Sequence, residues 1–225
     1  AGHGRSAAHR PRDRARARPH GWAVAVHARG SRADAEATAA DCRALGVRAE
    51  VLIADLADEA ACEALVPSAV AAFGRLDLLV NNASLFEYDD ARTAAGALME
   101  RHWRANTLAP VRLAQALHAH VLARGEGTAC VVNLLDQKLA NPNPDYFSYT
   151  LSKAALEAAG TMLAQALAPQ LRVCAVSPGV TLVSGPMDEA EFTQAHRLTP
   201  LGRSSTPADI ARAVRFLAES PAITG

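Results

Sequence analysis

Tyr149 and Lys153 stand four residues apart, and as a pair they could supply a proton in a reduction. Side chains at this spacing stack on one face of a helix. An ammonium beside a phenol lowers the pKa of the phenol towards neutrality, which favours proton donation. Asp136 precedes the pair, at the end of an apolar run that predicts a strand. Tyr146 is a second candidate phenol, but its fourth following residue is Thr150, so Tyr149 is preferred.

Taken alone, the Y-x-x-x-K spacing is also typical of an ordinary helix surface. The composition and the surrounding elements must therefore decide between a surface pair and a functional pair. Of 225 residues, 50% are apolar and the formal net charge is zero, which predicts one globular domain without a nucleic-acid-binding surface. No apolar run reaches the roughly 18 residues of a membrane span. The four cysteines lack C-x-x-C spacing, which indicates buried thiols in a reducing cytoplasm and no metal site.

Strand-like and helix-like segments alternate from Gly21 onward. Strands are expected at residues 22–27, 47–55, 76–82, 128–135 and 171–179. Helices are expected at residues 32–45, 59–73, 94–123 with a break near Pro110, 149–167, and 207–219 with Thr206 as N-cap. The alternation predicts an α/β fold, a Rossmann-like, doubly wound parallel sheet with helices on both faces. In such sheets the ligand binds at the carboxyl ends of the strands.

The motifs at those strand ends together resemble the short-chain dehydrogenase/reductase family over residues 21–225. Five motifs occur in the family's order: Asp55-Leu56, Asn81-Asn82-Ala83-Ser84, Asn106, Tyr149 with Lys153, and Ser177-Pro178-Gly179. One such motif alone would be weak, but five in order are a specific signal. The resemblance implies an oxidoreductase that binds a nicotinamide cofactor and reduces a small molecule.

The resemblance implies where the cofactor lies. Asp55 and Leu56 would touch the adenine, Asn82-Ala83-Ser84 would lie along the cofactor, and Pro178-Gly179 would lie beside the nicotinamide. The segment after the first predicted strand has no acid to bind a free ribose 2′-hydroxyl. Arg29 and Ser31, with Arg32, could instead bind a 2′-phosphate, so NADPH is the expected cofactor.

The resemblance also implies the catalytic roles. Tyr149 would donate the proton, and Lys153 would bind the nicotinamide ribose and lower the pKa of that phenol. Asn106 would support a proton relay through the lysine. The family usually has serine where this chain has Asp136, and this departure narrows the interpretation.

Asp136, together with the N-A-S-L-F segment that ends at Phe86, resembles the pteridine reductase branch. There the pterin lies between the nicotinamide and the phenylalanine, with the serine, here Ser84, near both ligands. A flat, electron-poor heterocycle suits an aromatic platform and a carboxyl group. We therefore expect reduction of a dihydropterin by hydride transfer. Alternatives stay open: Phe86 as an ordinary loop aromatic, Asp136 as a capping acid, and the protein as a 3-oxoacyl or other carbonyl reductase.

Residues 1–20 do not fit the family. They carry six arginines and no Val, Ile, Leu, Met or aromatic residue, where a first strand and a glycine-rich T-G-x-x-x-x-I-G phosphate loop are expected. Their codons, read from the second base, permit V-T-G-A-x-R-R-I-G-R-A-I-A-L-A-L-A. The junction His3/Gly4 permits only Thr or Met there, and the junctions His9/Arg10 and Asp13/Arg14 permit Ile or Thr when the arginine codon begins with cytosine. We expect two compensating frameshifts; the alternative is a genuine Arg-rich tail.

Without the phosphate loop the chain could also be a non-enzymatic remnant that no longer binds cofactor. The chain lacks an initial Met and stops at Gly225, before the family's final strand, so a fragment is expected. By resemblance the protein is expected to be a homo-oligomer, a tetramer or a dimer.

Overall fold

The computed structural model describes residues 21–182, 189–197 and 199–225. The aberrant segment 1–20 lies outside these residues. Five parallel strands are found in the described part of the chain: β1 (Val24–Ala28), β2 (Ala49–Ile53), β3 (Leu78–Asn81), β4 (Ala129–Leu134) and β5 (Leu171–Val176). Each of these strands is followed by a helix in the sequence, as the alternation predicted. The α/β class with parallel strands is therefore confirmed.

The helices occupy the segments between the strands. They are α1 (Arg32–Ala44), α2 (Glu59–Glu63), α3 (Leu65–Phe73), α4 (Gly96–Trp103), the π-helix η1 (Arg104–Leu108), α5 (Ala109–Arg124), the 3₁₀-helix η2 (Gln137–Ala140), α6 (Phe147–Leu167), α7 (Glu189–Arg197) and α8 (Pro207–Glu219). Thr206 caps α8 in a reciprocal capping box with Asp209, as expected for a Thr-Pro start. None of the helices described is long and apolar enough to cross a membrane.

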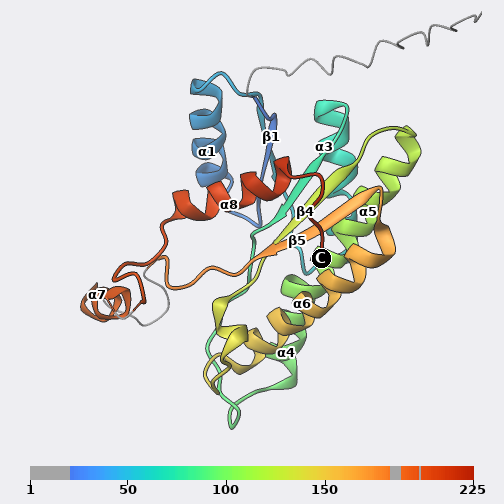
Figure 1. Cartoon of the computed structure of the whole chain (residues 1–225). Helices are drawn as coiled ribbons and strands as arrows, with labels where there is room; N and C mark the ends of the chain where they lie inside the picture. Colours follow the sequence, from blue (N-terminus) through green and yellow to red (C-terminus); the bar gives the residue numbers. More distant parts are fainter. Residues whose placement is uncertain (1–20, 183–188, 198) are drawn as a thin grey trace, which may run out of the picture.

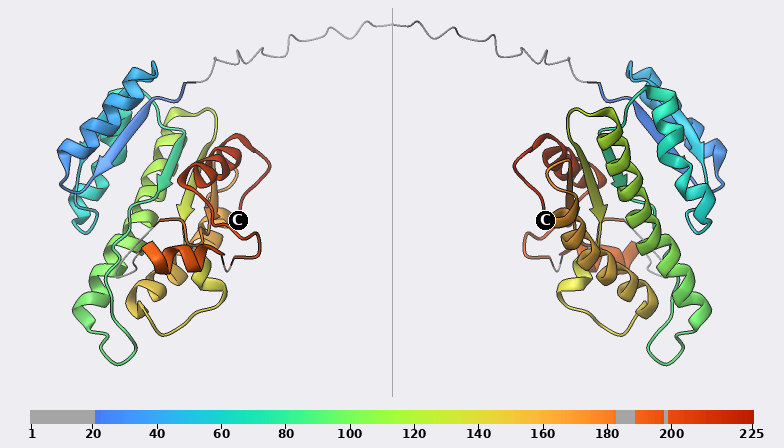
Figure 2. Two further views of the ribbon diagram at one scale, coloured as in Figure 1. Left: turned by 90° about the vertical axis from the view of Figure 1, so that its left-hand side faces the viewer. Right: turned by 90° about the vertical axis from the view of Figure 1, so that its right-hand side faces the viewer.

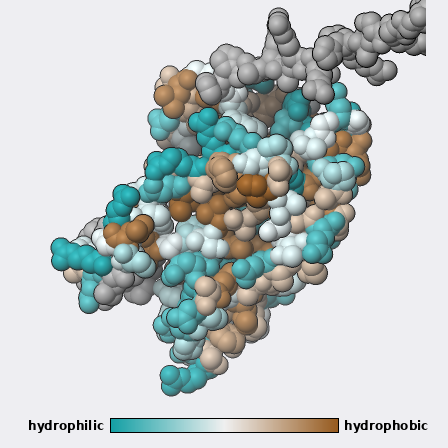
Figure 3. Space-filling view, viewed as in Figure 1, coloured by the Kyte–Doolittle hydropathy of each residue, from teal (hydrophilic) through white to brown (hydrophobic). Residues whose placement is uncertain are grey.

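The side chains of β4 point alternately to two layers of helices, because successive residues of a strand face opposite sides. Val131 packs in one cluster with Leu117 of α5 and Ala164 of α6. Cys130 and Val132 pack on the other side, against α8. Both faces are thus covered, which explains why every residue of β4 is buried. Figure 1 shows α8 crossing in front of β4 and β5, and Figure 3 shows hydrophobic side chains gathered on that face.

The sheet is divided in the middle. β1 pairs only with β2, whereas β3, β4 and β5 form a separate three-stranded sheet, so β1 and β3 have no mutual hydrogen bonds. The views in Figure 2 show the β1–β2 unit with α1 standing beside the rest of the domain. In the dinucleotide-binding fold the first strand lies at this central place, between the second and the fourth. The described strands match the second to sixth of that order, and Val80 of β3 is 38% exposed.

Two expected helices are interrupted, one near Pro67 and one just before Pro110. The helix expected over 59–73 is two helices, because Pro67 lacks the N–H that a continuous helix would need. The helix expected over 94–123 is broken by the π-turn η1 just before Pro110, which stands in the first turn of α5. A π-turn absorbs one extra residue, and such turns are frequent at functional sites. The break therefore falls on the turn that contains Asn106 rather than on the proline.

Candidate active site

Tyr149 and Asp136 meet at the carboxyl end of β4. Asp136 follows this strand, and Tyr149 stands in the first turn of α6, where it is only 6% exposed. The Tyr149 hydroxyl donates a 2.9 Å hydrogen bond to Oδ2 of Asp136. The other carboxylate oxygen accepts from the backbone N–H of Lys138 at 2.9 Å and so caps η2. Asp136 thus has both of the roles considered above: it caps η2 and it accepts a hydrogen bond from the phenol.

Lys153 stands one helical turn after Tyr149 and is 2% exposed. Its Nζ donates a 2.7 Å hydrogen bond to the carbonyl of Leu134 and lies 5.8 Å from the centre of the Tyr149 ring. Burial lowers the pKa of Lys153 to about 8, although Asp136 opposes this shift. The buried ammonium is held beside the phenol by the last residue of β4.

The expected lowering of the phenol pKa by lysine is wrong for this arrangement. Burial, followed by the negative charge of Asp136 and the hydrogen bond to it, raises the pKa of Tyr149. Desolvation penalises the phenolate, and an acceptor carboxylate stabilises the protonated phenol. Tyr149 therefore keeps its proton at neutral pH.

We expect the buried Lys153 ammonium to leave a signature in stability. Its folded pKa is lowered, so the native state loses the proton near pH 8 and the unfolded state near 10.5. Between these values the unfolded state binds more protons, and the stability of the native state rises with pH by about 3 kcal/mol in total. Burial raises the pKa of Cys62 and Cys130 to about 11, which lowers stability above pH 9 in every variant. The Lys153 contribution should therefore appear as a difference: in urea unfolding, the change in stability from pH 7 to pH 10 should be more favourable in the wild type than in Lys153→Met. Lys138→Met, at a more exposed lysine, should behave as the wild type does; an equal change in the wild type and Lys153→Met would contradict the assignment.

Asn106, in the π-turn η1, ties the loop after β3 to α6. Its amide oxygen accepts from the backbone N–H of Leu85 at 2.7 Å and from Ser84 Oγ at 3.3 Å. Its amide nitrogen donates to the Leu85 carbonyl at 2.9 Å and to Ser152 Oγ at 3.0 Å. These contacts position the Ser84–Leu85 loop, and none of them reaches Lys153. The predicted support of a lysine relay stays a prediction.

A cavity of about 320 Å³ opens at the carboxyl ends of β1, β2 and β3. Its lining contains several residues predicted to bind cofactor: Arg29, Asp55, Leu56, Ala83 and Ser84. Ser31 and Asn82 do not line it. Asn81, the first residue of the same motif, donates a 2.8 Å hydrogen bond to Asn133 and so joins β3 to β4. The cavity has a cation at the end of β1 and small residues along the β3 loop, as an adenosine with a 2′-phosphate requires.

Pro178, just after β5, contacts the segment that follows β4. Its carbonyl accepts from the backbone N–H of Gln137 at 3.0 Å, and a Cβ on Gly179 would meet the Gln137 side chain at 3.7 Å. The Pro178-Gly179 turn therefore lies against the segment that carries Asp136. This is the position expected for a turn beside the reacting end of the cofactor.

Phe86 lies beside Tyr149, as a substrate platform would. Its ring meets the Tyr149 ring edge-on, with 4.7 Å between centroids. Phe86 is 40% exposed, so part of the residue faces solvent. Ser84 belongs to the same loop, which brings all four predicted substrate contacts, Ser84, Phe86, Asp136 and Tyr149, to one region.

Sequence reasoning missed two buried groups behind this region. His102 accepts from the Glu87 N–H at 3.3 Å and contacts the Leu98 carbonyl at 3.1 Å, which fixes the backbone next to Phe86. Burial lowers the pKa of His102, so a neutral ring suits this role. Asp89 accepts from the backbone N–H of Ser148 at 3.0 Å and from its hydroxyl, and so caps α6 from a distant loop. No motif marks either residue, because each acts through contacts far apart in the sequence.

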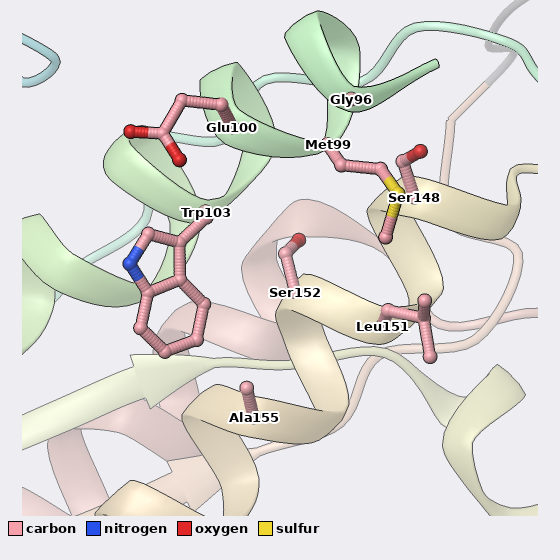
Figure 4. A pocket seen from close by; sticks show the side chains of 8 residues that line it. All are labelled: Gly96, Met99, Glu100, Trp103, Ser148, Leu151, Ser152 and Ala155. Carbon is pink, nitrogen blue, oxygen red and sulfur yellow. The ribbon is translucent and has the colours of Figure 1, made fainter. Parts of the chain in front are cut away.

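A second hollow, of about 300 Å³, lies between α4 and α6 and contains none of the predicted site residues. Figure 4 shows Met99 and Trp103 of α4 facing Leu151 and Ser152 of α6 across it. Met99, Trp103 and Leu151 are large apolar side chains that remain exposed. This surface has the character of a contact face rather than of a reaction site.

Comparisons with known proteins agree with this geometry. A family model described as enoyl-(acyl carrier protein) reductase matches residues 15–225. An uncharacterized oxidoreductase from Methylorubrum extorquens is 35% identical over 221 residues, covering 91% of this chain and 84% of that protein. The 3-oxoacyl-[acyl-carrier-protein] reductase FabG from Staphylococcus aureus is 31% identical over 221 residues, covering 91% of this chain and 85% of that protein.

A solved structure is also similar. The crystal structure of FolM alternative dihydrofolate reductase 1 from Brucella canis, complexed with NADP, has a TM-score of 0.83 at 38% identity. The match covers 91% of this chain and 80% of that chain. The parallel strands, the strand-end motifs and these matches lead to one conclusion: the chain belongs to the short-chain dehydrogenase/reductase family of oxidoreductases.

Proposed function

We propose that this protein is an NADPH-dependent reductase of a dihydropterin. The observation that carries the proposal is the hydrogen bond from Tyr149 to Asp136, with the Phe86 ring edge-on beside the phenol. A carboxyl group and an aromatic surface at the proton donor match the hydrogen-bonding edge and the flat face of a pterin. The FolM structure, an alternative dihydrofolate reductase complexed with NADP, supports both the substrate class and the cofactor.

The residues present fit NADPH. Arg29 would bind the 2′-phosphate, Asp55 and Leu56 would contact the adenine, and Ala83 and Ser84 would line the path of the cofactor, since all five line one cavity. When bound, NADPH supplies the hydride. Lys153, buried next to Tyr149, would bind the nicotinamide ribose.

The proton comes from the Tyr149–Asp136 pair. Tyr149 holds a proton at Oη because its pKa is raised, and Asp136 Oδ2 lies 2.9 Å away. Donation by Tyr149 alone would place a phenolate beside a carboxylate, and two adjacent negative charges in a buried site are costly. A proton from solvent that first binds the Asp136 carboxylate and then passes to Tyr149 as the phenol donates avoids this cost, because no second negative charge is left in the site. One hydride and one proton then convert the dihydropterin to the tetrahydropterin.

A 3-oxoacyl reductase is the second candidate, because FabG matches nearly the whole chain. Turnover of 7,8-dihydrobiopterin should be compared with turnover of an acetoacetyl thioester, with NADPH consumption as the measurement. We expect the dihydropterin to be the better substrate. Reduction of the thioester alone would exclude the pterin proposal.

Asp136→Ser provides the matched variant for that comparison. Serine keeps a hydrogen-bonding hydroxyl near Tyr149 but cannot hold an acidic proton. We expect dihydropterin turnover to fall by about 10- to 100-fold, within the range of one acid–base contribution. Thioester turnover should change less, and an equal loss with both substrates would instead indicate general damage to the site.

We propose further that the central place between β1 and β3 belongs to a strand that residues 1–20, as written, do not encode. The described strands leave that place without a strand, and the shifted reading supplies the glycine-rich loop and helix that follow such a strand. Two compensating frameshifts explain both observations. Resequencing the coding DNA tests this, and a clean read without nearby insertions or deletions relative to related genes would exclude it.

We also propose a homo-oligomer in the cytoplasm. The exposed Met99, Trp103 and Leu151 around the α4–α6 hollow support a contact between copies of this chain. All four cysteines are free thiols, and three of them are buried, which supports a reducing compartment.

A further inference from the structure

Tyr146, immediately before α6, has an unusual backbone. Its φ and ψ are 53° and 47°, and among the described residues it is the only non-glycine with positive φ. A bulky side chain in this left-handed region costs about 1–3 kcal/mol, and such strain is concentrated at functional sites. The surrounding contacts hold the conformation: the Tyr146 carbonyl accepts from the Thr150 N–H at 2.9 Å and from the Thr150 hydroxyl at 2.8 Å.

The strained backbone places the Tyr146 ring flat against Phe86. The two ring planes differ by 8°, with 4.2 Å between centroids. Tyr88 meets the Tyr146 ring edge-on at 5.1 Å, and the Lys138 ammonium lies over the ring at 5.7 Å from its centre. Lys138 is itself held by the carbonyl of Asp145. Tyr146 is therefore fixed from several directions and has one face on Phe86.

Phe86 is thereby fixed relative to Tyr149. One face of the Phe86 ring is covered by Tyr146, while the ring also contacts Tyr149 in a perpendicular arrangement. Phe86 as a residue nevertheless remains 40% exposed, so part of it stays accessible to a ligand. A flat substrate on that surface would lie beside the proton donor in one orientation.

We propose that Tyr146 is a positioning residue that selects flat, aromatic-like substrates by holding the Phe86 ring in place. The inference rests on the proposed function, since it assigns a role in recognising the same substrate. A planar heterocycle binds more tightly to a rigid aromatic ring than to a mobile one, because the stacking energy depends on the relative orientation of the two rings. An acyl thioester has no planar ring at its reacting end, so its affinity should depend little on how the Phe86 ring is held.

Two variants distinguish the effect of the Tyr146 ring from the effect of its left-handed backbone conformation. Tyr146→Phe keeps the stack on Phe86 and removes only the hydroxyl. Tyr146→Asn removes the ring, and asparagine tolerates the left-handed conformation better than other side chains with a Cβ. We expect Asn to raise KM for dihydrobiopterin by about three- to tenfold, the size of one aromatic pair, and to leave kcat for that substrate nearly unchanged. Tyr146→Phe should keep KM for dihydrobiopterin at the wild-type value. KM for the acetoacetyl thioester should not change in either variant.

A double variant tests whether Tyr146 acts through Phe86. In a Phe86→Leu background, Tyr146→Asn should raise KM no further, because the two residues form one unit. Additive effects in the double variant, or equal increases of KM for both substrates in Tyr146→Asn, would overturn the proposal.

A measurement without substrate keeps the inference separate from the proposed function. The protein is labelled with 4-fluorophenylalanine, and the Phe86 resonance is identified by its loss in Phe86→Leu. Tyr146→Asn should shift this resonance because the stacked ring current is lost, and Tyr146→Phe should keep it near its wild-type position. An unchanged resonance in Tyr146→Asn overturns the positioning role. If the resonance shifts but the wild type does not reduce dihydrobiopterin, the proposed function fails and the substrate part of this inference fails with it.

Discussion

A chain that carries the shifted reading is expected to bind NADPH at least about 100-fold more tightly than the chain as written. In this variant a leader of four β-branched residues and the segment V-T-G-A-A-R-R-I-G-R-A-I-A-L-A-L-A replace residues 1–18. The leader and first residues would form the strand between β1 and β3, and the glycine-rich turn would direct backbone N–H groups to the pyrophosphate. Hydrogen bonds to a charged group contribute about 1.5–3 kcal/mol each, so two account for the gain. Titration with NADPH, followed by fluorescence, measures the affinity of both chains.

A matched control separates the completed sheet from the phosphate site. The same variant with both glycines of its T-G-A and I-G segments changed to Val keeps an apolar strand and helix but blocks close approach of the pyrophosphate. We expect its Tm to rise above that of the chain as written, without the gain in NADPH affinity. Equal NADPH affinity of the chain as written and the chain with the glycine loop would contradict the proposal that this loop is missing.

Tyr149→Phe is expected to lower kcat for dihydrobiopterin by about 10²- to 10⁴-fold, the range for loss of one positioned acid. The phenol keeps its proton because its pKa is raised, and the variant removes the atom that carries this proton. The ring and its edge contact with Phe86 remain, so NADPH affinity should change little. Single-turnover kinetics and NADPH titration, in a chain that binds the cofactor, measure both quantities.

Tyr88→Phe is the control for the loss of a phenol hydroxyl in the same aromatic cluster, since Tyr88 is exposed and contacts Tyr146 rather than Asp136. It should keep kcat near the wild-type value. If Tyr149→Phe also retained kcat, the proton would have to come from Asp136 or solvent without the phenol.

Much of the architecture could be predicted from local patterns. The apolar runs at β4 and β5 and the Thr-Pro start of α8 have the expected places, with strand ends shifted by one to three residues. The helix over 59–73 was predicted as single because periodicity does not show how a proline is accommodated, whereas a break near Pro110 was expected in the helix over 94–123. The π-turn around Asn106 likewise depends on packing against the loop after β3 and on Ser152.

The pairing of Asp136 with Tyr149 was anticipated from the family resemblance, because Asp136 stands where the family usually has serine. The direction of the phenol pKa was not, since it depends on burial and on which charge approaches the hydroxyl. The left-handed backbone of Tyr146 and the roles of His102 and Asp89 were also missed. These features depend on contacts between segments far apart in sequence, which a motif does not encode.

The divided sheet also affects any measurement of molecular mass. In the described chain, β1 and β3 each have an edge without a partner strand in their own sheet. Such edges can pair with strands of another molecule and lead to aggregation. A heavy species could therefore arise by joining of these edges rather than by contact across the α4–α6 surface. Replacing Trp103 by a charged residue should dissociate only the second kind of assembly, whereas filling the centre of the sheet should remove only the first.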